Sequence, residues 1–465
     1  MVGPGSSSSS SKSRASIASI RRFRYLAIAS CIACVLLVSG RYSHPETFSA
    51  LTSFSPSSSF SSSSSSSQQC DPYQSLGYLH VSTFDANAHR WHPFREDCHA
   101  PAYLAALVKE AWSIQEPTNS GPLTKPSAWR ESDLGPDGRE WQDVSWARNK
   151  TVVIVGDSVM RFNALYFCKI MGENFVEMKW DHPWSPPSPM LGKPMHGHKR
   201  DSTPLSTNSN SDSNDTTTTT IAKSSNAGNP NSHLTHYCHI PSIDLFILQI
   251  FHVGLDEDEA WIHKEGATTA YTVEDRIDKL LKVYLQKLEE QEGRSAPVLG
   301  YLQSSLWDAA RWTQEDAKAN APEDLVLSDE RLRWFRRRVR EVILHMRRAF
   351  PSMALRWMTT HYPVNPSTGR FFDSKRPPSR LDWLSQINAA SLSAFRDTDG
   401  LDPEEARLLR GVQSNNWGDL MMGQEKHLAD DLHPAMFPGG YLWGDMMLWD
   451  LKQAVTQRSS LWSRG

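Results

Sequence analysis

The stretch Thr151-Val-Val-Ile-Val-Gly-Asp-Ser158 decides the predicted fold. Its first five residues are all β-branched, which is typical of a short strand buried in a sheet. Residues 159–171, which follow it, are predicted to form a helix. Ser158 then lies at the carboxyl end of a buried strand, next to the free N–H groups of a helix N-terminus. A serine so placed is suited to act as a nucleophile whose oxyanion is stabilised by nearby donors.

The rest of the chain continues this alternation of strands and helices. Further strands are predicted at residues 243–253, 297–303 and 353–360, and further helices at 274–290, 328–349 and 380–396. Strands that alternate with helices predict an α/β fold, with a parallel sheet between two layers of helices. Ligands of such sheets bind beyond the carboxyl ends of the strands, which is where Ser158 is expected.

The N-terminal region predicts a membrane anchor rather than part of the fold. Residues 1–40 carry five basic residues and no acidic ones, although the whole chain has a net charge of −3. That overall balance excludes a general nucleic-acid binder. The uncharged run at residues 25–40 follows three of the arginines, so residues 1–24 are expected to be a cytosolic tail. We favour an uncleaved signal anchor; a cleaved signal peptide is the alternative.

Either interpretation sends the remaining chain into the secretory pathway. Residues 41–69 are rich in Ser and predict a flexible stem, and residues 201–233 predict a disordered insert. Residues 70–465 would form one lumenal domain, and we expect a single-pass type II protein of the Golgi membrane. Glycosylation sequons occur at Asn149 and Asn214.

Four cysteines fall in the predicted lumenal domain, an even number that suits an oxidising compartment. They are Cys70, Cys98, Cys168 and Cys238. Of the three possible pairings we favour Cys70–Cys98 with Cys168–Cys238. Residues 70–149 are rich in Trp and have no clear periodicity, so they predict an irregular cap held by the first of these bridges.

A second motif lies near the C-terminus, in Leu428-Ala429-Asp430-Asp431-Leu432-His433-Pro434. A nucleophilic serine needs a base, usually His, and that His needs a carboxylate to hold its tautomer. The spacing Asp430-x-x-His433 can place both groups on one tight turn. The alternative is a helix end with His433 merely exposed on the surface.

Together the two motifs resemble those of the SGNH/GDSL hydrolase superfamily, and in particular its PC-esterase and trichome-birefringence-like branch, which acts on O-acyl groups of glycans. Three further blocks carry this resemblance, which extends over roughly residues 70–457. They are Gln303-Ser304-Ser305-Leu306-Trp307-Asp308, Cys70-Asp71 with Trp91-His92-Pro93 and Cys98, and His433-Pro434 followed by Pro438-Gly439-Gly440-Tyr441-Leu442-Trp443.

The resemblance implies an SGNH-like domain in which Ser158 is the nucleophile and His433 the general base. Asp430 would orient the imidazole, with Asp431 the less favoured choice. Oxyanion donors would be the backbone N–H groups of Ser158 and Gly254, together with the side chain of Gln303. The family has Asn at the position of Gln303, so this chain departs from the family pattern there. Arg161 and Trp307 are the candidates for substrate binding.

The expected activity is that of a serine-dependent acyl esterase or O-acyltransferase, with O-acetyl as the expected acyl group. The resemblance implies a glycan substrate and no cofactor or metal, and it leaves the acyl donor unidentified. Two other functions stay open. One is a metal-dependent Golgi glycosyltransferase that uses Asp256 and Asp258, and the other is a non-catalytic glycan-binding module.

Two patterns are interpreted as structural rather than functional. The spacing His233-x-x-His236-x-x-His239 is similar to a set of zinc ligands, but a solvated edge is favoured. Arg336, Arg337, Arg338 and Arg340 fall on one predicted helix and are interpreted as a solvated face.

Overall fold

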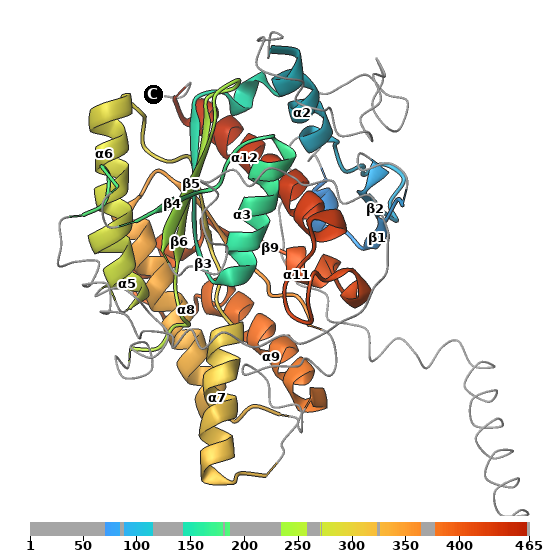
Figure 1. Ribbon diagram of the computed structural model, residues 1–465. Coiled ribbons are helices and arrows are strands. Elements are labelled where there is room, and N and C mark those ends of the chain that lie inside the picture. The colour runs from blue at the N-terminus through green and yellow to red at the C-terminus, as the bar shows by residue number, and fades with distance from the viewer. Residues whose placement is uncertain are drawn as a thin grey trace, which may run out of the picture. The chain divides into compact units, whose positions relative to one another are not determined.

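The computed structural model describes residues 70–83, 88–114, 143–179, 182–186, 234–257, 270, 272–322, 326–363 and 377–462 (Figure 1). The predicted tail, anchor, stem and insert all lie outside these ranges, as does Asn214. Among the helices that the structure describes, none is long and apolar enough to cross a bilayer. The described part of the chain forms a mostly parallel sheet flanked by helices.

The sheet has seven strands in the order β4-β5-β6-β3-β7-β8-β9. Five of them run parallel: β6 (Leu245–Phe251), β3 (Lys150–Gly156), β7 (Leu299–Leu302), β8 (Ala354–Met358) and β9 (Val412–Asn415). Two short strands, β4 (Val176–Met178) and β5 (Thr235–Ile240), extend one edge in antiparallel fashion. The central strand β3 is buried from its second residue onward, as its β-branched composition predicts.

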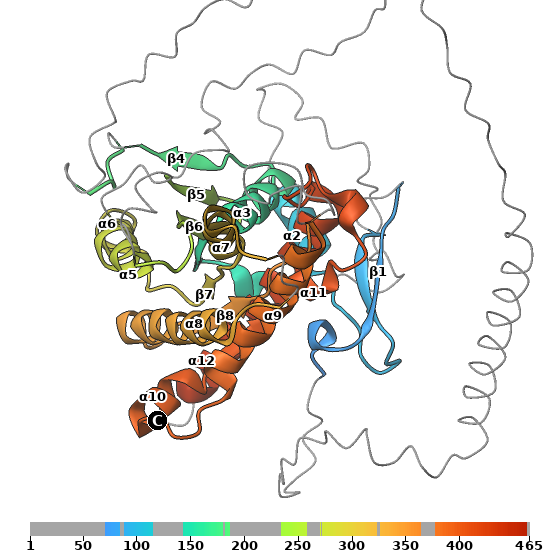
Figure 2. The ribbon, with the colours of Figure 1, turned by 90° about the horizontal axis from the view of Figure 1, so that it is seen from below.

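Helices cover both faces of the sheet (Figure 1). Helices α3 (Ser158–Ile170) and α12 (Tyr441–Trp462) pack together on one face. On the other face lie α5 (Val273–Arg276), which continues through a π-turn into α6 (Lys282–Glu292), and α8 (Asp329–Ala349). The remaining helices of the sheet domain are α7 (Leu306–Ala319), α9 (Pro377–Arg396), α10 (Pro403–Leu409) and α11 (Trp417–Leu420). Helices α8 and α9 lie side by side in Figure 2 and are in contact.

The predicted α/β architecture is therefore confirmed at the level of a helix-flanked, mostly parallel sheet. Each strand and helix predicted between residues 151 and 396 is present, with bounds that differ by a few residues. The antiparallel strands β4 and β5 and the last parallel strand β9 were not predicted. Helix α12 was also missed, because it is buried nearly all round and so shows no amphipathic period.

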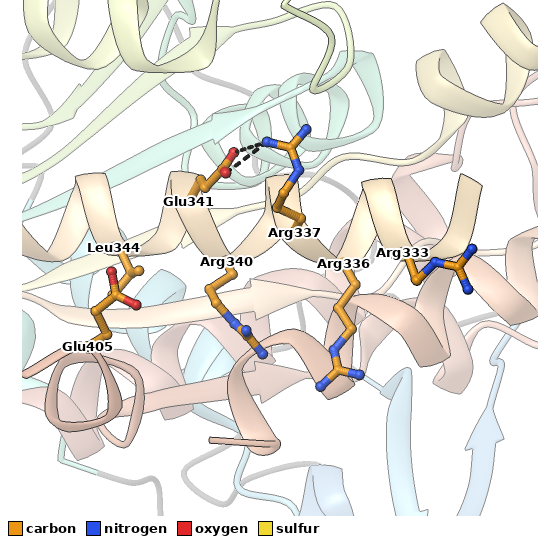
Figure 3. A pocket seen from close by; sticks show the side chains of 7 residues that line it. All are labelled: Arg333, Arg336, Arg337, Arg340, Glu341, Leu344 and Glu405. Carbon is orange, nitrogen blue, oxygen red and sulfur yellow. Dashed lines mark hydrogen bonds and ion pairs between the residues drawn. The ribbon is translucent and has the colours of Figure 1, made fainter. Parts of the chain in front are cut away.

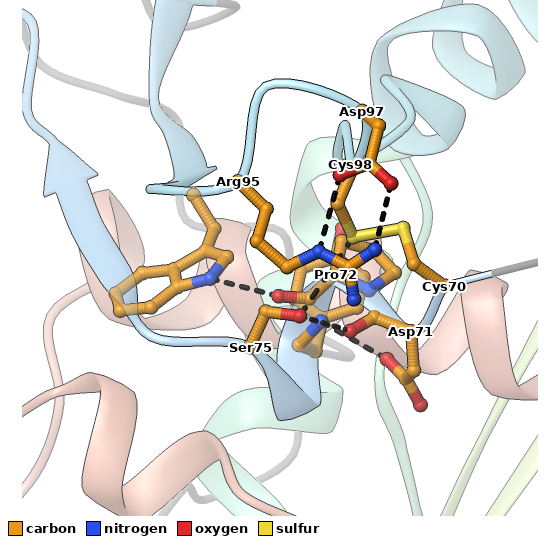
Figure 4. Close-up of a disulfide and its surroundings, with 9 residues drawn as sticks. Cys70, Asp71, Pro72, Ser75, Arg95, Asp97 and Cys98 are labelled. Atoms are coloured by element: carbon orange, nitrogen blue, oxygen red, sulfur yellow. Dashed lines mark hydrogen bonds and ion pairs between the residues drawn. A yellow bond between two sulfur atoms is a disulfide. The ribbon is translucent and has the colours of Figure 1, made fainter.

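The N-terminal cap contains more regular structure than its sequence predicts. Strands β1 (Gly77–His80) and β2 (Arg90–Pro93) form an antiparallel pair, and α2 (Tyr103–Ile114) packs against α12. The disulfide between Cys70 and Cys98 closes this region, with a Cα–Cα distance of 5.8 Å (Figure 4). The prediction of an irregular cap is thus wrong for these elements, whereas the bridge that holds the cap is confirmed.

The second predicted disulfide, Cys168–Cys238, is also present, with a Cα–Cα distance of 6.2 Å. It joins helix α3, which begins at Ser158, to strand β5, the second strand from one edge of the sheet. Both cysteines are completely buried. Two disulfides indicate that this domain folds in an oxidising compartment.

Candidate active site

Ser158 is the first residue of helix α3, directly beyond the carboxyl end of β3. The preceding Asp157 caps the helix, because its Oδ1 accepts a hydrogen bond from the Val159 N–H at 2.9 Å. Gly156 makes the sharp junction possible: a Cβ there would lie 2.5 Å from Cγ of Met160. The strand–glycine–cap order therefore leaves Ser158 half-buried at the end of the central strand, as the sequence predicts.

The second motif forms a tight turn that its own aspartate stabilises. Asp430 Oδ1 accepts hydrogen bonds from the backbone N–H groups of Leu432 at 2.8 Å and His433 at 2.6 Å. Ala429 N–H in turn donates to the His433 carbonyl at 2.8 Å. A short carboxylate that caps its own turn is a common local arrangement of Asp. It fixes the Asp430 carboxylate and the His433 imidazole on the same side of the turn.

The fold brings this turn onto Ser158. His433 Nε2 lies 2.8 Å from Ser158 Oγ, and His433 Nδ1 lies 2.9 Å from Asp430 Oδ2. A carboxylate can only accept, so the proton of a neutral imidazole is assigned to Nδ1. Nε2 then presents its lone pair to the serine hydroxyl, which donates to it. The carboxylate that meets the imidazole is that of Asp430, the residue favoured over Asp431.

The surroundings hold the two ionisable groups of this triad in complementary charge states. Burial lowers the pKa of His433, and this effect outweighs the opposite influence of Asp430; the nearby charge of Arg161 lowers the pKa further. Burial would raise the pKa of Asp430, but the hydrogen bonds from His433 and Leu432 lower it overall. At neutral pH the carboxylate is therefore ionised and the imidazole is neutral, which is the state that a serine nucleophile needs.

Gln303 lies close to Ser158, but its side chain contacts other groups than the predicted oxyanion. Its side chain is buried, with 1% exposed. Its Nε2 lies 2.9 Å from Thr360 Oγ1, 3.3 Å from Asp157 Oδ2 and 3.4 Å from Ser305 Oγ. The amide nitrogen carries two hydrogens, and three oxygen acceptors lie within reach of them. One of these acceptors is the carboxylate of Asp157, so in this structure the amide supports the residue that caps helix α3. The predicted role of Gln303 as an oxyanion donor would require this amide to turn away from these partners.

Gly254, whose backbone N–H is another predicted oxyanion donor, lies just beyond the end of β6, the strand next to β3. Its φ of 79° is in the left-handed region that favours glycine, and a Cβ would approach Asp308 Oδ1 to 3.0 Å. Asp308 Oδ1 also accepts from the Leu255 N–H at 2.8 Å. Asp308, the last residue of the Gln303–Asp308 block, therefore fixes the loop that carries Gly254 after β6, the neighbour of β3.

The two candidates for substrate binding are both buried. Arg161 is 3% exposed and lies over the ring of Phe251, with its guanidinium carbon 5.0 Å from the ring centroid. Burial lowers its pKa to about 10, so it stays protonated at neutral pH. Trp307 is 4% exposed and meets Phe251 edge to face. Trp307 therefore packs in the interior, which does not fit the stacking of a sugar ring on its face in this conformation.

Several residues that contact the triad were not singled out from the sequence. The ring of Phe162 lies with its centroid 4.6 Å from that of His433. His361, which follows β8, hydrogen-bonds the carbonyl of Leu432. Phe162 lies one helical turn after Ser158, which is a usable sequence signal. A single histidine after a strand gives no comparable signal.

The competing metal motifs do not gather into a site. His236 and His239 lie three residues apart on strand β5, so they point to opposite faces. His236 stacks on Phe175 at 4.9 Å, and Cys238 is in the disulfide. Asp256 is 5% exposed and forms an ion pair with Arg311. Asp258 and His233 lie outside the described residues, and within the described ranges no group of three potential metal ligands is found.

Four arginines of α8 line a pocket with Glu341, Leu344 and Glu405 (Figure 3), namely Arg333, Arg336, Arg337 and Arg340. Arg337 pairs with Glu341, and Arg336 pairs with Asp397. These two are half-exposed, as expected of a solvated face, but Arg338 is buried and pairs with Glu274. The pocket shares no residue with the triad, and its arginines are largely balanced by carboxylates.

Comparison of the sequence with protein-family models gave no match, and comparison with curated proteins gave none either.

Proposed function

We propose that this chain is a serine-dependent acyl esterase or O-acyltransferase of the SGNH/GDSL type, similar to the PC-esterase and trichome-birefringence-like branch. The observation that carries the proposal is the continuous hydrogen-bonded array from Asp430 through His433 to Ser158. Its position beyond the carboxyl ends of a parallel sheet, at a helix N-terminus, supports the same conclusion. We further propose an O-acetylated glycan as the substrate.

The chemistry takes two steps. Ser158 Oγ attacks the carbonyl carbon of the ester while His433 Nε2 takes the hydroxyl proton. The carbon–oxygen bond to the leaving alcohol breaks, and this alcohol receives the proton from His433. An acyl-serine remains, and water or a sugar hydroxyl then attacks it while His433 again takes and returns a proton. Backbone N–H groups at Ser158 and Gly254 are the proposed donors to the oxyanion.

The proposed setting is the lumen of the Golgi, with the chain held in the membrane by residues 25–40. The two disulfides support an oxidising compartment. No specific contact favours the glycosyltransferase alternative, because the Asp256 carboxylate is already in an ion pair with Arg311. The hydrogen-bonded triad likewise favours catalysis over glycan binding alone.

The test is mass spectrometry of the purified full-length protein after incubation with p-nitrophenyl acetate. We expect one acetyl group on Ser158, absent from Ser158→Ala and unaffected by EDTA. Ser352→Ala, an exposed serine before β8, is the matched control and should be acetylated like the wild type. Acetyl transfer that persists in Ser158→Ala, or that EDTA abolishes, contradicts the proposal. Addition of glycan acceptors to the acetylated protein then separates a transferase from an esterase.

A further inference from the structure

His361 is a buried histidine that the proposed reaction does not use directly. It lies three residues beyond β8 with 1% of its surface exposed. Its Nε2 is 2.7 Å from the carbonyl oxygen of Leu432, which lies between Asp430 and His433 in the catalytic turn. A carbonyl oxygen only accepts, so the proton of His361 is assigned to Nε2. Its Nδ1 has no hydrogen-bond partner among the described residues.

The backbone around His361 is held from three sides. Thr360 N–H donates to Asn388 Oδ1 at 2.9 Å, and Asn388 Nδ2 donates back to the Thr360 carbonyl at 2.8 Å. Thr359 N–H donates to the Asn415 carbonyl at 2.9 Å. Helix α11 approaches so closely that a Cβ on Gly418 would lie 2.3 Å from the carbonyl carbon of Thr360. This segment is therefore a rigid support.

The same segment reaches both halves of the triad. Thr360 Oγ1 accepts from Gln303 Nε2, and Gln303 in turn contacts Asp157, the residue before Ser158. His361 reaches the turn that carries Asp430 and His433. The ring of His361 is itself fixed edge to face against Trp417, at 5.3 Å between centroids. Burial also lowers the pKa of His361 to about 4, so the ring is neutral at neutral pH and adds no charge beside His433.

We propose that His361 is a positioning residue, whose Nε2–H bond to the Leu432 carbonyl holds the Asp430–His433 turn at the correct distance from Ser158. This inference rests on the proposed function. The Asp430 bonds shape the turn internally, but they do not place it relative to the sheet. The bond from His361 does so, because His361 follows β8, a strand of the sheet. Its neighbour in the sheet is β7, which is followed directly by Gln303.

The test measures kcat and KM for p-nitrophenyl acetate hydrolysis by the full-length protein. His361→Leu removes the hydrogen-bond donor to Leu432, so the turn that carries His433 is free to shift. A displacement of about 1 Å at His433 should lower kcat by up to about 10²-fold with little change in KM. His361→Gln, whose amide can donate at nearly the same place, should recover most of that loss. His239→Leu, on strand β5 away from the triad, is the matched control and should keep wild-type kcat.

A double-mutant cycle separates positioning from general destabilisation. If His361 acts through the Asp430–His433 turn, then His361→Leu should cost less than about 3-fold in an Asp430→Asn background. Equal losses in both backgrounds, or a folded His361→Leu with wild-type kcat, would overturn the inference. Should His361→Leu not fold, His361→Asn serves instead, because its amide is about 1.5 Å too short to reach Leu432.

Failure of the proposed function gives a different result. A wild-type protein that forms no acetyl-Ser158 overturns that function and this inference with it. A wild-type protein that forms acetyl-Ser158, with no difference between His361→Leu and His361→Gln, overturns the positioning role alone.

Discussion

Ser158 and His433 owe their positions to two different kinds of local structure. Ser158 is placed by a strand, a glycine and a helix cap, whereas His433 is placed by a turn that Asp430 closes. Both arrangements are short in sequence, so both motifs could be recognised before the structure. Their meeting across 275 positions follows from the topology of the sheet, which no local pattern contains.

The pH dependence of acylation follows from the charge states of the triad. Because burial lowers the pKa of His433 below its ordinary value of about 6.5, the base is neutral above that pKa and protonated below it. We expect the rate of p-nitrophenol release to rise with pH and to reach half its plateau below about pH 6.5. In Asp430→Asn the loss of the anion should lower this midpoint further and reduce the plateau, because the tautomer is no longer held. A midpoint clearly above 6.5 would contradict the assignment.

Replacement of Gln303 decides between two roles for its amide. Asn is about 1.5 Å shorter, so Gln303→Asn should break the bonds to Thr360 and Asp157. If the amide supports the helix cap, the acylation rate should fall by roughly 10- to 100-fold, with about 1–3 kcal/mol lost from the free energy of unfolding. Stopped-flow acylation and urea denaturation measure the two quantities. An acylation rate that stays the same or rises in Gln303→Asn would instead support the predicted role of Gln303 as an oxyanion donor.

Around the site, the sequence does not predict which side chains are buried. Trp307 and Arg161 are the candidates for substrate binding, but the structure packs both against Phe251. His361 was not selected because one histidine after a strand has no periodic or paired signal. The contacts that decide these cases come from strands distant in sequence.

At the scale of helices and strands, the sequence predicts best those elements that have a strong pattern of apolar residues. Strands β3 and β6 consist mostly of apolar residues, and the sequence locates both within a few residues. Strand β9 has the sequence Val-Gln-Ser-Asn, which carries little strand signal, and it becomes a strand by pairing with β8. Strand β5 contains two histidines and a cysteine, so its pattern indicates a solvated edge rather than a strand, yet His236 is buried in the structure.

The Cys168–Cys238 bridge should stabilise the nucleophile helix against the sheet edge. It closes a loop with a sequence separation of 70, which is worth about 4 kcal/mol in the chain-entropy model. We expect the Cys168→Ser/Cys238→Ser double variant to lose a free energy of unfolding of this order in urea titrations. Cys70→Ser/Cys98→Ser, which opens a loop of separation 28, is the comparison and should lose slightly less. Free thiols at Cys168 and Cys238 in a non-reducing peptide map would refute the bridge.

At the scale of the whole molecule, the parallel strands collect the site at one edge of the sheet. Ser158 follows β3, Gly254 follows β6, Gln303 follows β7 and His361 follows β8. This grouping was predictable once the strands were recognised as parallel. The position of the C-terminal turn was not, because it lies between α11 and α12 and belongs to no strand.

The proposed membrane anchor gives a prediction for the entire chain. If residues 25–40 are an uncleaved anchor, the cell-derived protein should retain its N-terminal segment, and Asn149 should be open to lumenal glycosylation. Asn149 is exposed in the structure, at the start of β3. Peptide mapping before and after glycosidase treatment tests both points. An N-terminus at Arg41 would show that the segment is cleaved.

The separation of Ser158 from His433 along the chain has a consequence for biosynthesis. A nascent chain that has emerged as far as helix α9 already contains the nucleophile and the central strands, but not its base. In the proposed chemistry, the hydroxyl of Ser158 therefore stays unactivated until the turn that carries Asp430 and His433 has been synthesised. If the proposed chemistry is right, the nascent protein is inert toward acyl donors until the Asp430–His433 turn docks on Ser158.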